Sequence, residues 1–467
     1  MEPPRREWSS FRDPGGFVFH ANGVVYRQVN EHARADYQQL IESGLYSELA
    51  RDGLLVSHEE VELERALEGC AYAVLRPQPI PFVSYPYEWC FSQYKAAAEL
   101  TLEVQRRALN RGMILRDASS YNVQFLGHRP IFIDTLSFGS YEQGSPWVAY
   151  RQFCTHFLAP LSLMAHASPA LGQLTRVHLD GIPLTLASTL LPMSSRLRAG
   201  ILVHVHLHAR SEGVPSRQQA AALVRKNGHL SKTALLGIVE SLSRTVGSLH
   251  FRKKKSIWSD YVDETNYTPV ARASKEQIVG DWIDRLHAEQ PLKMVWDLGA
   301  NTGTFSRLAG RLGSHVVSFD LDHAAVESNF QHCQAESTRT ILPLIQDVTN
   351  PSPGLGWRNR ERRSLQQRGP SELTLALALV HHLVIARGVP ISAVAAFLHE
   401  ISRYLILEFV PKEDSQIQRM LAFREDIFGD YSQVAFETAF NRYFRTVATA
   451  HVRESARILY LMESRSL

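Results

Sequence analysis

A glycine-rich turn between a strand and a helix is the part of this chain best suited to hold a nucleotide-like ligand. The apolar run Val295–Leu298 leads into Gly299 and Gly303, with Asp297 near the end of the predicted strand and Asn301 within the turn. Glycine permits a tight turn and a close approach of a ligand to backbone N–H groups. The spacing is G-x-x-x-G and not the G-x-G-x-x-G of dinucleotide-binding folds, so it argues against NAD. An ordinary strand-to-helix turn of an α/β domain is the alternative.

Two more acidic residues follow apolar runs that are predicted to be strands. Asp320 ends the run 315–320, and Asp347 follows the run 341–346. The carboxyl ends of parallel strands meet at one edge of a sheet, so we expect these side chains beside the glycine turn. A carboxylate at that edge can accept hydrogen bonds from ribose hydroxyl groups. Asp322 is expected to cap the helix that follows. Each acid taken alone is also typical of an ordinary strand end or helix cap.

A histidine pair provides the side chains most suited to proton transfer. The continuous apolar run Leu373–Val380, typical of a strand buried on both faces, is followed by His381 and His382. A neutral imidazole there could take a proton from a hydroxyl or amine nucleophile, and the other histidine would be structural. Glu408, near the end of the predicted strand Tyr404–Val410, is a further candidate. No metal site is predicted, because no further His or Cys lies nearby at ligand spacing.

These segments together resemble the class I S-adenosylmethionine (SAM) methyltransferases. After the five predicted parallel strands, residues 446–452 and 457–462 have the pattern of an antiparallel hairpin, so the resemblance covers about Lys275 to Glu463 in order. It implies an α/β fold with a Rossmann-like seven-stranded sheet and SAM as the cofactor. The cofactor contacts would come from Asp297, Gly299, Asn301 and Gly303, from Asp320 on the ribose and from Asp347 on the adenine amino group. The residues beside the transferred methyl group would be His381, His382 or Glu408.

Composition places the chain among soluble globular proteins, and we expect it in the cytoplasm. Apolar residues make up 45% and charged residues 21%, and a net charge of +3 is too small to predict a nucleic-acid partner or a membrane surface. No apolar run approaches the roughly 20 residues of a membrane span, and the first residues do not form a signal peptide. The four cysteines have no metal-ligand spacing and fit buried thiols in a reducing compartment.

A length of 467 residues predicts two or three domains. We expect a separate α+β N-terminal domain over 1–250, a linker or lid over 251–274 and the methyltransferase domain over 275–467. The basic run Arg252–Lys255 would be a solvated linker. The aromatic residues that follow would fold over the site as a lid or pack on the sheet edge, and they are Trp258, Tyr261 and Tyr267. The arginine-rich segment Pro351–Pro370 would be solvated or would face an anionic acceptor.

The N-terminal domain carries a second motif that could do chemistry. Asp117, Asn122 and Asp134, the last after the apolar run Ile131–Ile133, resemble a degenerate catalytic loop of the protein-kinase and aminoglycoside-kinase superfamily. The resemblance implies that Asp117 orients a hydroxyl group while the other two residues hold Mg²⁺. No glycine-rich phosphate loop or strand lysine precedes it, and little of that stretch has the pattern of a complete nucleotide-binding lobe. A kinase-like remnant that binds an acceptor or partner, or a coincidental turn, is favoured over a working kinase.

Three other patterns predict local structure in the N-terminal domain. We expect a hairpin within Phe17–Gln28, a helix over Glu31–Arg51 and an amphipathic helix over Tyr94–Asn110. His204, His206 and His208 alternate at strand period, which would place them on one face. They would be metal ligands or, more commonly, half-exposed polar positions of a strand or helix.

As a whole, the chain resembles the rhizobial host-specific nodulation proteins of the NoeA type. The resemblance is carried by 297–303, by 376–383 and by 117–122 with 133–134. It implies a lipo-chitooligosaccharide signal or its precursor as the acceptor. Three hypotheses follow: SAM-dependent methyl transfer to a small-molecule or oligosaccharide acceptor, a non-catalytic SAM-binding scaffold whose N-terminal domain recruits a protein partner, and a phosphotransferase built on the kinase-like motif.

Overall fold

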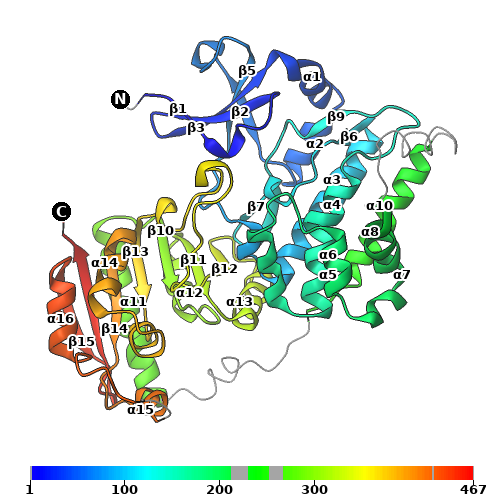
Figure 1. Ribbon diagram of the computed structural model, residues 1–467. Helices are drawn as coiled ribbons and strands as arrows, with labels where there is room; N and C mark the ends of the chain where they lie inside the picture. Colours follow the sequence, from blue (N-terminus) through cyan, green and yellow to red (C-terminus); the bar gives the residue numbers. More distant parts are fainter. Residues whose placement is uncertain (1–2, 212–229, 252–266, 423–424, 466–467) are drawn as a thin grey trace. The chain divides into compact units, whose positions relative to one another are not determined.

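The computed structural model describes residues 3–211, 230–251, 267–422 and 425–465 (Figure 1). The chain forms two compact units. Unit 1 comprises Met1–Arg252 with Leu355–Arg362, and unit 2 comprises Lys253–Gly354 with Arg363–Leu467. The basic run Arg252–Lys255 and the aromatic residues Trp258 and Tyr261 lie outside the described residues. No helix among the described residues is both long and apolar enough to cross a membrane.

Unit 2 is built on a seven-stranded sheet in the order β12-β11-β10-β13-β14-β16-β15. Figure 1 shows the neighbouring strands from β12 at one edge to the red β15 at the other. The strands β10 to β14 form parallel pairs, while β16 runs antiparallel to both β14 and β15. The strands are β10 Met294–Leu298, β11 His315–Asp320, β12 Ile341–Ile345, β13 Ser371–Ala376, β14 Ser402–Phe409, β15 Phe444–His451 and β16 Ile458–Ser464.

Helices cover both faces of this sheet, because successive strand residues point to opposite sides. Ile406 of β14 lies in the apolar core that includes Val279 and Ile283 of α11. Phe409 of the same strand faces the other way and packs on Phe436 of α16, with 4.9 Å between the ring centroids. The helices are α11 Pro269–Glu289, α12 Thr304–Gly310, α13 His323–Ala335, α14 Ile391–Ile401, α15 Ser415–Leu421 and α16 Gln433–Asn441. Burial on both faces explains the continuous apolar character of the central strands.

The turn after β10 requires backbone conformations that favour glycine. Gly299 (φ +74°) and Gly303 (φ +83°) lie in the left-handed region, as does Asn301 (φ +50°), a residue type that tolerates it. A Cβ at Gly299 would be in ordinary contact with Leu379, at 3.5 Å. A Cβ at Gly303 would come within 2.4–2.7 Å of the Asn329 side chain of α13. Gly303 therefore allows α12 to pack closely on α13.

Two element boundaries in unit 2 differ from those expected. β13 ends at Ala376, earlier than the apolar run suggests, and Ala378 takes a left-handed conformation (φ +52°) before the histidine pair. α11 begins at Pro269, so the last part of the expected linker or lid 251–274 is helical. Proline suits the first turn of a helix, and the Thr268 hydroxyl caps this one by accepting a backbone N–H at 3.1 Å.

Unit 1 begins with a five-stranded antiparallel sheet in the order β1-β2-β3-β5-β4. Its strands are β1 Arg5–Arg6, β2 Gly16–Ala21, β3 Val24–Asn30, β4 His58–Val61 and β5 Ala71–Pro77. The expected hairpin is β2–β3, with Asn22 and Gly23 at positive φ as a tight two-residue turn requires. Phe17 and Phe19 of β2 pack with Tyr26 of β3 in its core. The sheet has more strands than the sequence predicts. The strands β1 and β4 are short and polar, so they carry no alternating apolar pattern.

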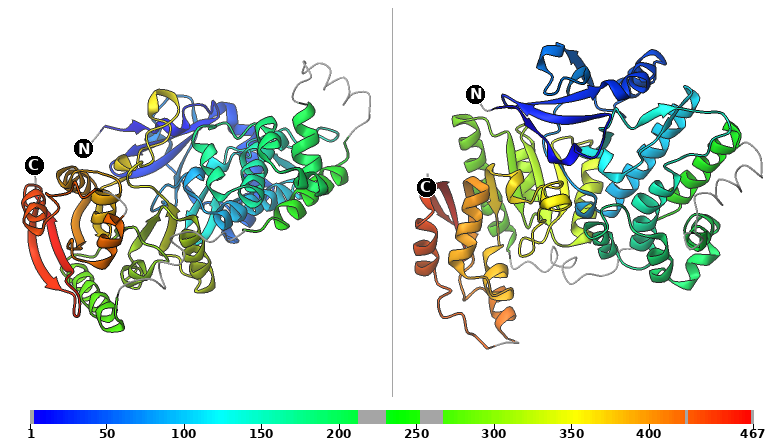
Figure 2. Two further views of the ribbon diagram at one scale, coloured as in Figure 1. Left: turned by 60° about the horizontal axis from the view of Figure 1, so that its bottom comes forward. Right: turned by 45° about the horizontal axis from the view of Figure 1, so that its top comes forward.

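Helices and two small antiparallel sheets make up the rest of unit 1. Figure 2 shows the blue sheet and the cyan-to-green helices from two further sides. The expected helix Glu31–Arg51 is broken at Gly44, which has φ +74°. The helices are α1 Arg34–Glu42, α2 Leu45–Arg51, α3 Phe91–Asn110, α4 Tyr150–Phe153, α5 Ala159–His166, α6 Leu184–Leu190, α7 Ala199–Ile201, α8 His208–Ser211 and α10 Lys232–Gly247. The strand pairs are β6 Met113–Leu115 with β9 Phe138–Ser140, and β7 Val123–Leu126 with β8 Arg129–Phe132.

The strand period of His204, His206 and His208 is not realised, because Leu202–Leu207 forms a π-helical turn. Hydroxyl groups lie within 2.7–2.9 Å of both ring nitrogens of the first two histidines, from Tyr150 and Ser241 at His204 and from Ser188 and Ser195 at His206. These are hydrogen-bonded histidines of the unit 1 interior. In the part of the chain that the structure describes, no group of three His, Cys, Asp or Glu residues could hold a metal ion.

Gly303→Ala is expected to lower the free energy of unfolding by about 1–3 kcal/mol, because alanine is strained in the left-handed region and its Cβ would clash with Asn329. Urea unfolding followed by tryptophan fluorescence measures the change. Gly429→Ala is the matched control, since a Cβ there meets nothing within 4 Å. Equal stability of the two variants would contradict the packing role of Gly303.

Candidate functional site

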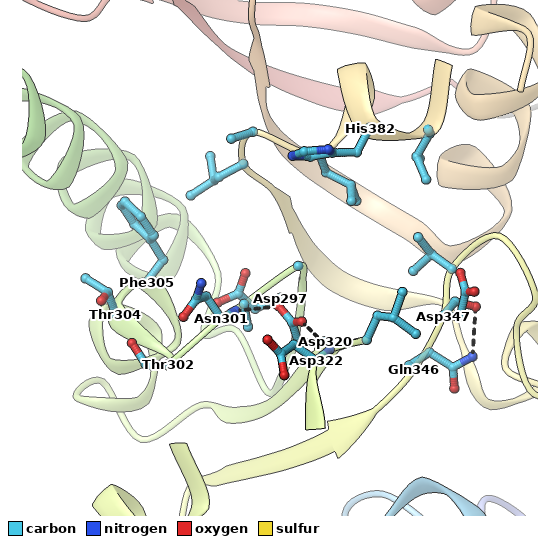
Figure 3. A pocket seen from close by; sticks show the side chains of 18 of the residues that line it. Asp297, Asn301, Thr302, Thr304, Phe305, Asp320, Asp322, Gln346, Asp347 and His382 are labelled. Carbon is cyan, nitrogen blue, oxygen red and sulfur yellow. Dashed lines mark hydrogen bonds between the residues drawn. The ribbon is translucent and has the colours of Figure 1, made fainter. Parts of the chain in front are cut away.

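A cavity of about 320 Å³ opens at the carboxyl edge of the parallel strands of unit 2. Its volume is at the lower end of the range for small-molecule sites. Figure 3 shows Asp297 and Asp320 close together, Asp347 on another side, and His382 across the cavity from Asp320. The lining residues come from α11 and from the segments that follow β10, β11, β12 and β13. The parallel register therefore brings residues that are distant in sequence to one edge.

Asp320, at the end of β11, is held by two backbone donors. The N–H groups of Asn301 and Asp322 each donate to one of its carboxylate oxygens, both at 2.8 Å. Burial raises the pKa of Asp320, and these two N–H groups oppose the rise. The fixed carboxylate keeps further lone pairs that hydroxyl groups of a ligand could use. Asp322 caps α13 as expected, accepting the N–H of Ala324 at 2.7 Å, and it also lines the cavity.

Asp297 is buried in β10 beside the glycine turn. Its carboxylate accepts a hydrogen bond from the hydroxyl of Ser306 on α12 at 2.6 Å, and Ser318 of β11 donates to Ser306 at 2.6 Å. Burial raises the pKa of Asp297 to about 6; the Ser306 hydrogen bond opposes this rise and the charge of Asp320 adds to it. A cationic ligand group beside these two carboxylates would favour their ionised forms.

The segment after β12 forms another wall of the cavity. Asp347 Oδ1 accepts the backbone N–H of Thr349 at 2.8 Å and its hydroxyl at 2.6 Å. Gln346 also lines the cavity, and its side-chain oxygen accepts a hydrogen bond from Ser352 at 3.0 Å. Gln346 was not among the predicted site residues, although its position at the end of a strand on the site edge was a usable signal. Leu321 adds apolar lining.

The histidine pair divides into one cavity residue and one buried residue. His382 begins the π-helical turn His382–Ala386 and lines the cavity. His381 is fully buried, does not line the cavity, and has no hydrogen-bond partner for either ring nitrogen among the described residues. The centroids of the His381 and His382 rings lie 4.2 Å apart. Burial, with a smaller effect of the Arg457 charge, lowers the pKa of His382 to about 4, so the cavity holds a neutral imidazole at neutral pH.

Glu408 does not line the cavity and is instead the centre of a buried group of charges. Lys275 Nζ donates to Glu408 Oε2 at 2.6 Å, the Tyr267 hydroxyl donates to Oε1, and a guanidinium nitrogen of Arg457 lies 3.7 Å from Oε1. Arg457 also pairs with Asp414 at 2.8 Å. Burial would raise the pKa of Glu408, but the charges of Lys275 and Arg457 outweigh it and lower the pKa. Glu408 is therefore an anion paired with Lys275 and Arg457. It does not lie at the cavity, where the resemblance implied contact with an acceptor.

Tyr267 and Lys275 are cavity residues whose roles the sequence did not reveal. Tyr267 was expected in a lid or on the sheet edge. Its hydroxyl accepts hydrogen bonds from Arg457 at 2.6 Å and from Lys275 at 3.1 Å, and both Tyr267 and Lys275 line the cavity. Lys275 Nζ also lies 4.9 Å from the ring centroid of Phe305. A single lysine on a helix carries no signal of such a role, because its partners are distant in sequence.

The arginine-rich segment 351–370 does not contribute its arginines to the cavity, although the structure describes all five. Its part Leu355–Arg362 belongs to unit 1. There the Arg362 guanidinium lies 3.9 Å from the ring centroid of Tyr121, and those of Arg358 and Arg360 lie 5.6 Å from the Trp8 ring. These three arginines therefore make cation–π contacts with aromatic rings of unit 1.

The residues of the kinase-like motif lie together in unit 1, but internal donors occupy them. Asn122 Nδ2 donates to the Ser137 hydroxyl at 3.1 Å, and Ser137 donates to Asp134 Oδ2 at 2.6 Å. Arg27 of β3 forms a salt bridge with Asp134 Oδ1 at 2.5 Å. Asp117 accepts a glutamine side-chain donor at 2.7 Å and a backbone N–H at 2.9 Å. A guanidinium thus stands at the carboxylate where the resemblance implied Mg²⁺.

The walls of the unit 2 cavity fit SAM. The carboxylates of Asp320 and Asp347 suit ribose hydroxyl groups and an adenine amino group, and Asp297 suits an ammonium group. A Cβ at Gly299 would point toward Leu379, which also lines the cavity, so glycine leaves this space to a ligand. Unit 2 thus has the seven-stranded sheet that the resemblance to class I SAM-dependent methyltransferases implied, and the residues at its carboxyl edge suit SAM as a cofactor.

The relationship of the whole chain is more specific. No protein-family model matches it. Nodulation protein NoeA of Rhizobium meliloti (strain 1021) is 35% identical over 465 residues, which span 98% of this chain and 96% of that protein. The chain belongs to the NoeA family of nodulation proteins.

Several solved structures match less than half of the chain. Magnesium protoporphyrin IX methyltransferase (ChlM) from Synechocystis PCC 6803, with bound SAH, is 18% identical with a TM-score of 0.32, covering 44% of this chain and 93% of that one. The PH0226 protein from Pyrococcus horikoshii OT3 is 13% identical with a TM-score of 0.31, covering 44% of this chain and 99% of that one. The bifunctional kinase-methyltransferase WbdD is 16% identical with a TM-score of 0.29, covering 47% and 45%. These scores are too low to support a functional assignment.

Asp320→Ala is expected to weaken binding of S-adenosylhomocysteine (SAH) by about tenfold to a hundredfold, because hydrogen bonds from ribose hydroxyl groups to a carboxylate would be lost. Calorimetric titration of the full chain measures the affinity. Asp430→Ala is the control, since Asp430 is an exposed aspartate of unit 2 that does not line the cavity. Unchanged affinity in well-folded Asp320→Ala would contradict the ribose assignment.

SAH affinity is expected to fall as the pH is lowered from 7 to 5, because Asp297 takes up a proton near its pKa of about 6 and no longer attracts an ammonium group. The sign follows from the raised pKa: the anion dominates above it and the neutral acid below it. Calorimetry across this range measures the slope. Asp297→Asn should bind more weakly at pH 7 and show a flatter profile, whereas a profile as steep as that of the unchanged chain would exclude Asp297 as its source.

Proposed function

We propose that unit 2 transfers the methyl group of SAM to a hydroxyl or amine group of an oligosaccharide, namely a nodulation-signal oligosaccharide or its precursor. The observation that carries the proposal is the neutral imidazole of His382 in the same cavity as the carboxylates that suit SAM. The acceptor class is supported by the name of the R. meliloti relative, a nodulation protein.

The residues of the chain divide the work between binding and proton transfer. Asp297, Asp320 and Asp347 hold the cofactor, which supplies an electrophilic methyl carbon when bound. His382 takes the proton from the acceptor nucleophile at a ring nitrogen, which is free of a proton at neutral pH. Lys275, anchored by Glu408, fixes the start of α11 as part of the cavity wall. Alignment of the two reactants by rigid walls supplies the remainder of the rate enhancement.

A non-catalytic SAM-binding scaffold is the alternative function, because the cofactor side of the cavity does not involve His382. It predicts SAH binding without transfer to any acceptor. The phosphotransferase hypothesis is disfavoured, since Arg27 pairs with Asp134 where that hypothesis requires Mg²⁺.

His382→Ala is expected to reduce methyl transfer by about 10²–10⁴-fold while changing SAH affinity little, because the lost group acts on the acceptor proton and not on the cofactor. The assay follows tritium from methyl-labelled SAM into chitin oligosaccharides and their N-deacetylated forms. His332→Ala is the control, since that exposed histidine does not line the cavity. SAH binding without labelled product from the unchanged chain would favour the scaffold, and full transfer by His382→Ala would remove His382 from the mechanism.

A further inference from the structure

Unit 1 exposes a group of large apolar side chains in its helical part. They belong to α6, to the segment that follows it and to the π-helical turn before α8. Figure 1 labels α6 and α8. This group, termed the 190–207 surface, consists of Leu190, Met193, Leu197, Val203 and Leu207. Leu197 is 88% exposed and Met193 is 70% exposed. Single exposed apolar residues are common, but several on adjoining elements mark an interaction site.

The backbone beneath the 190–207 surface is held by buried contacts. Ser195, between Met193 and Leu197, is buried, and its hydroxyl is 2.8 Å from the Nε2 atom of His206. The other ring nitrogen of His206 is 2.7 Å from the hydroxyl of Ser188 on α6. One imidazole thus links the three elements that carry the surface. Met193 and Leu197 point outward from a fixed framework, so a partner could bind them without first ordering a loop.

The charged side chains of the segment 190–207 are two arginines, Arg196 and Arg198. Residues 181–211 contain no Asp or Glu. Arg196 and Arg198 flank Leu197, and both are exposed. Within the described residues neither arginine forms a salt bridge with a carboxylate, so their charges are available to an anionic partner.

We propose that the 190–207 surface docks unit 1 on a membrane that contains anionic phospholipids. Apolar side chains between arginines match the interface of such a bilayer, where acyl chains lie beneath negatively charged headgroups. Leu197 and Met193 enter the apolar layer, while Arg196 and Arg198 remain at the headgroup phosphates. A nucleic acid would pair with the arginines but would offer no apolar layer to these aliphatic side chains. The surface thus gives unit 1 a reversible attachment to such a membrane.

Flotation of the full chain with vesicles tests this surface directly. The chain should bind vesicles of phosphatidylcholine with phosphatidylglycerol, bind pure phosphatidylcholine vesicles much less, and dissociate as salt is raised. Leu197→Asp should weaken binding by at least about tenfold, because it removes an apolar side chain that enters the bilayer and puts in its place a charge of the same sign as the headgroups. Arg196→Gln with Arg198→Gln should weaken it by about fivefold for each charge removed.

Val434→Asp on α16 is the matched control, since Val434 is 74% exposed and an aspartate is compatible with the first turn of a helix. It should bind vesicles like the unchanged chain, and all variants should keep the same melting temperature. The proposal is overturned if the folded chain does not bind anionic vesicles, or if Leu197→Asp and Val434→Asp behave alike. It is also overturned if Leu197→Asp converts a dimer to a monomer with unchanged vesicle binding, because the surface would then join two copies of the chain.

Discussion

The parallel pairing of β10, β11 and β12 is the constraint on which the site depends. Their register places the carboxyl ends side by side, so Asp297, Asp320 and Asp347 come to one edge although they are distant in sequence. Each carboxylate is then held by local donors, such as the two N–H groups on Asp320. The orientation of these groups is thus set by the sheet before any ligand binds, which reduces the entropy that binding must overcome.

A buried group of charges around Glu408 holds other elements of unit 2 at the same cavity. Glu408 of β14 meets Lys275 of α11 and Arg457, which lies just before β16, and Tyr267 lies among them. Removing one member of such a group leaves charges buried without a partner, which is far more costly than loss of a surface salt bridge. The group fixes three elements around the cavity. Burial lowers the pKa of His382, and the charge of Arg457 in this group lowers it further, which keeps that imidazole neutral.

The sequence allowed the prediction of strands and strand-end residues, because apolar runs and turns are local signals. Asp320 could be placed at the site edge on that basis. The roles of Glu408 and Lys275 could not, since they depend on contacts between positions more than a hundred residues apart. Nor could the pattern of two adjacent histidines show that only His382 lines the cavity, because the turn after β13 decides which ring points inward. The alternation of the histidines near 204 left strand and helix open, and the structure has a helical turn in which His204 and His206 contact hydroxyl groups distant in sequence.

The central claim is that SAM binds at the carboxyl edge of the unit 2 sheet. Photolabelling of the full chain with tritiated SAM, followed by peptide mapping, tests it most directly. We expect label in peptides that carry the cavity lining from 297 to 322 or from 346 to 349, and competition by SAH should remove it. Label confined to peptides of unit 1, or label that SAH does not displace, would contradict the account.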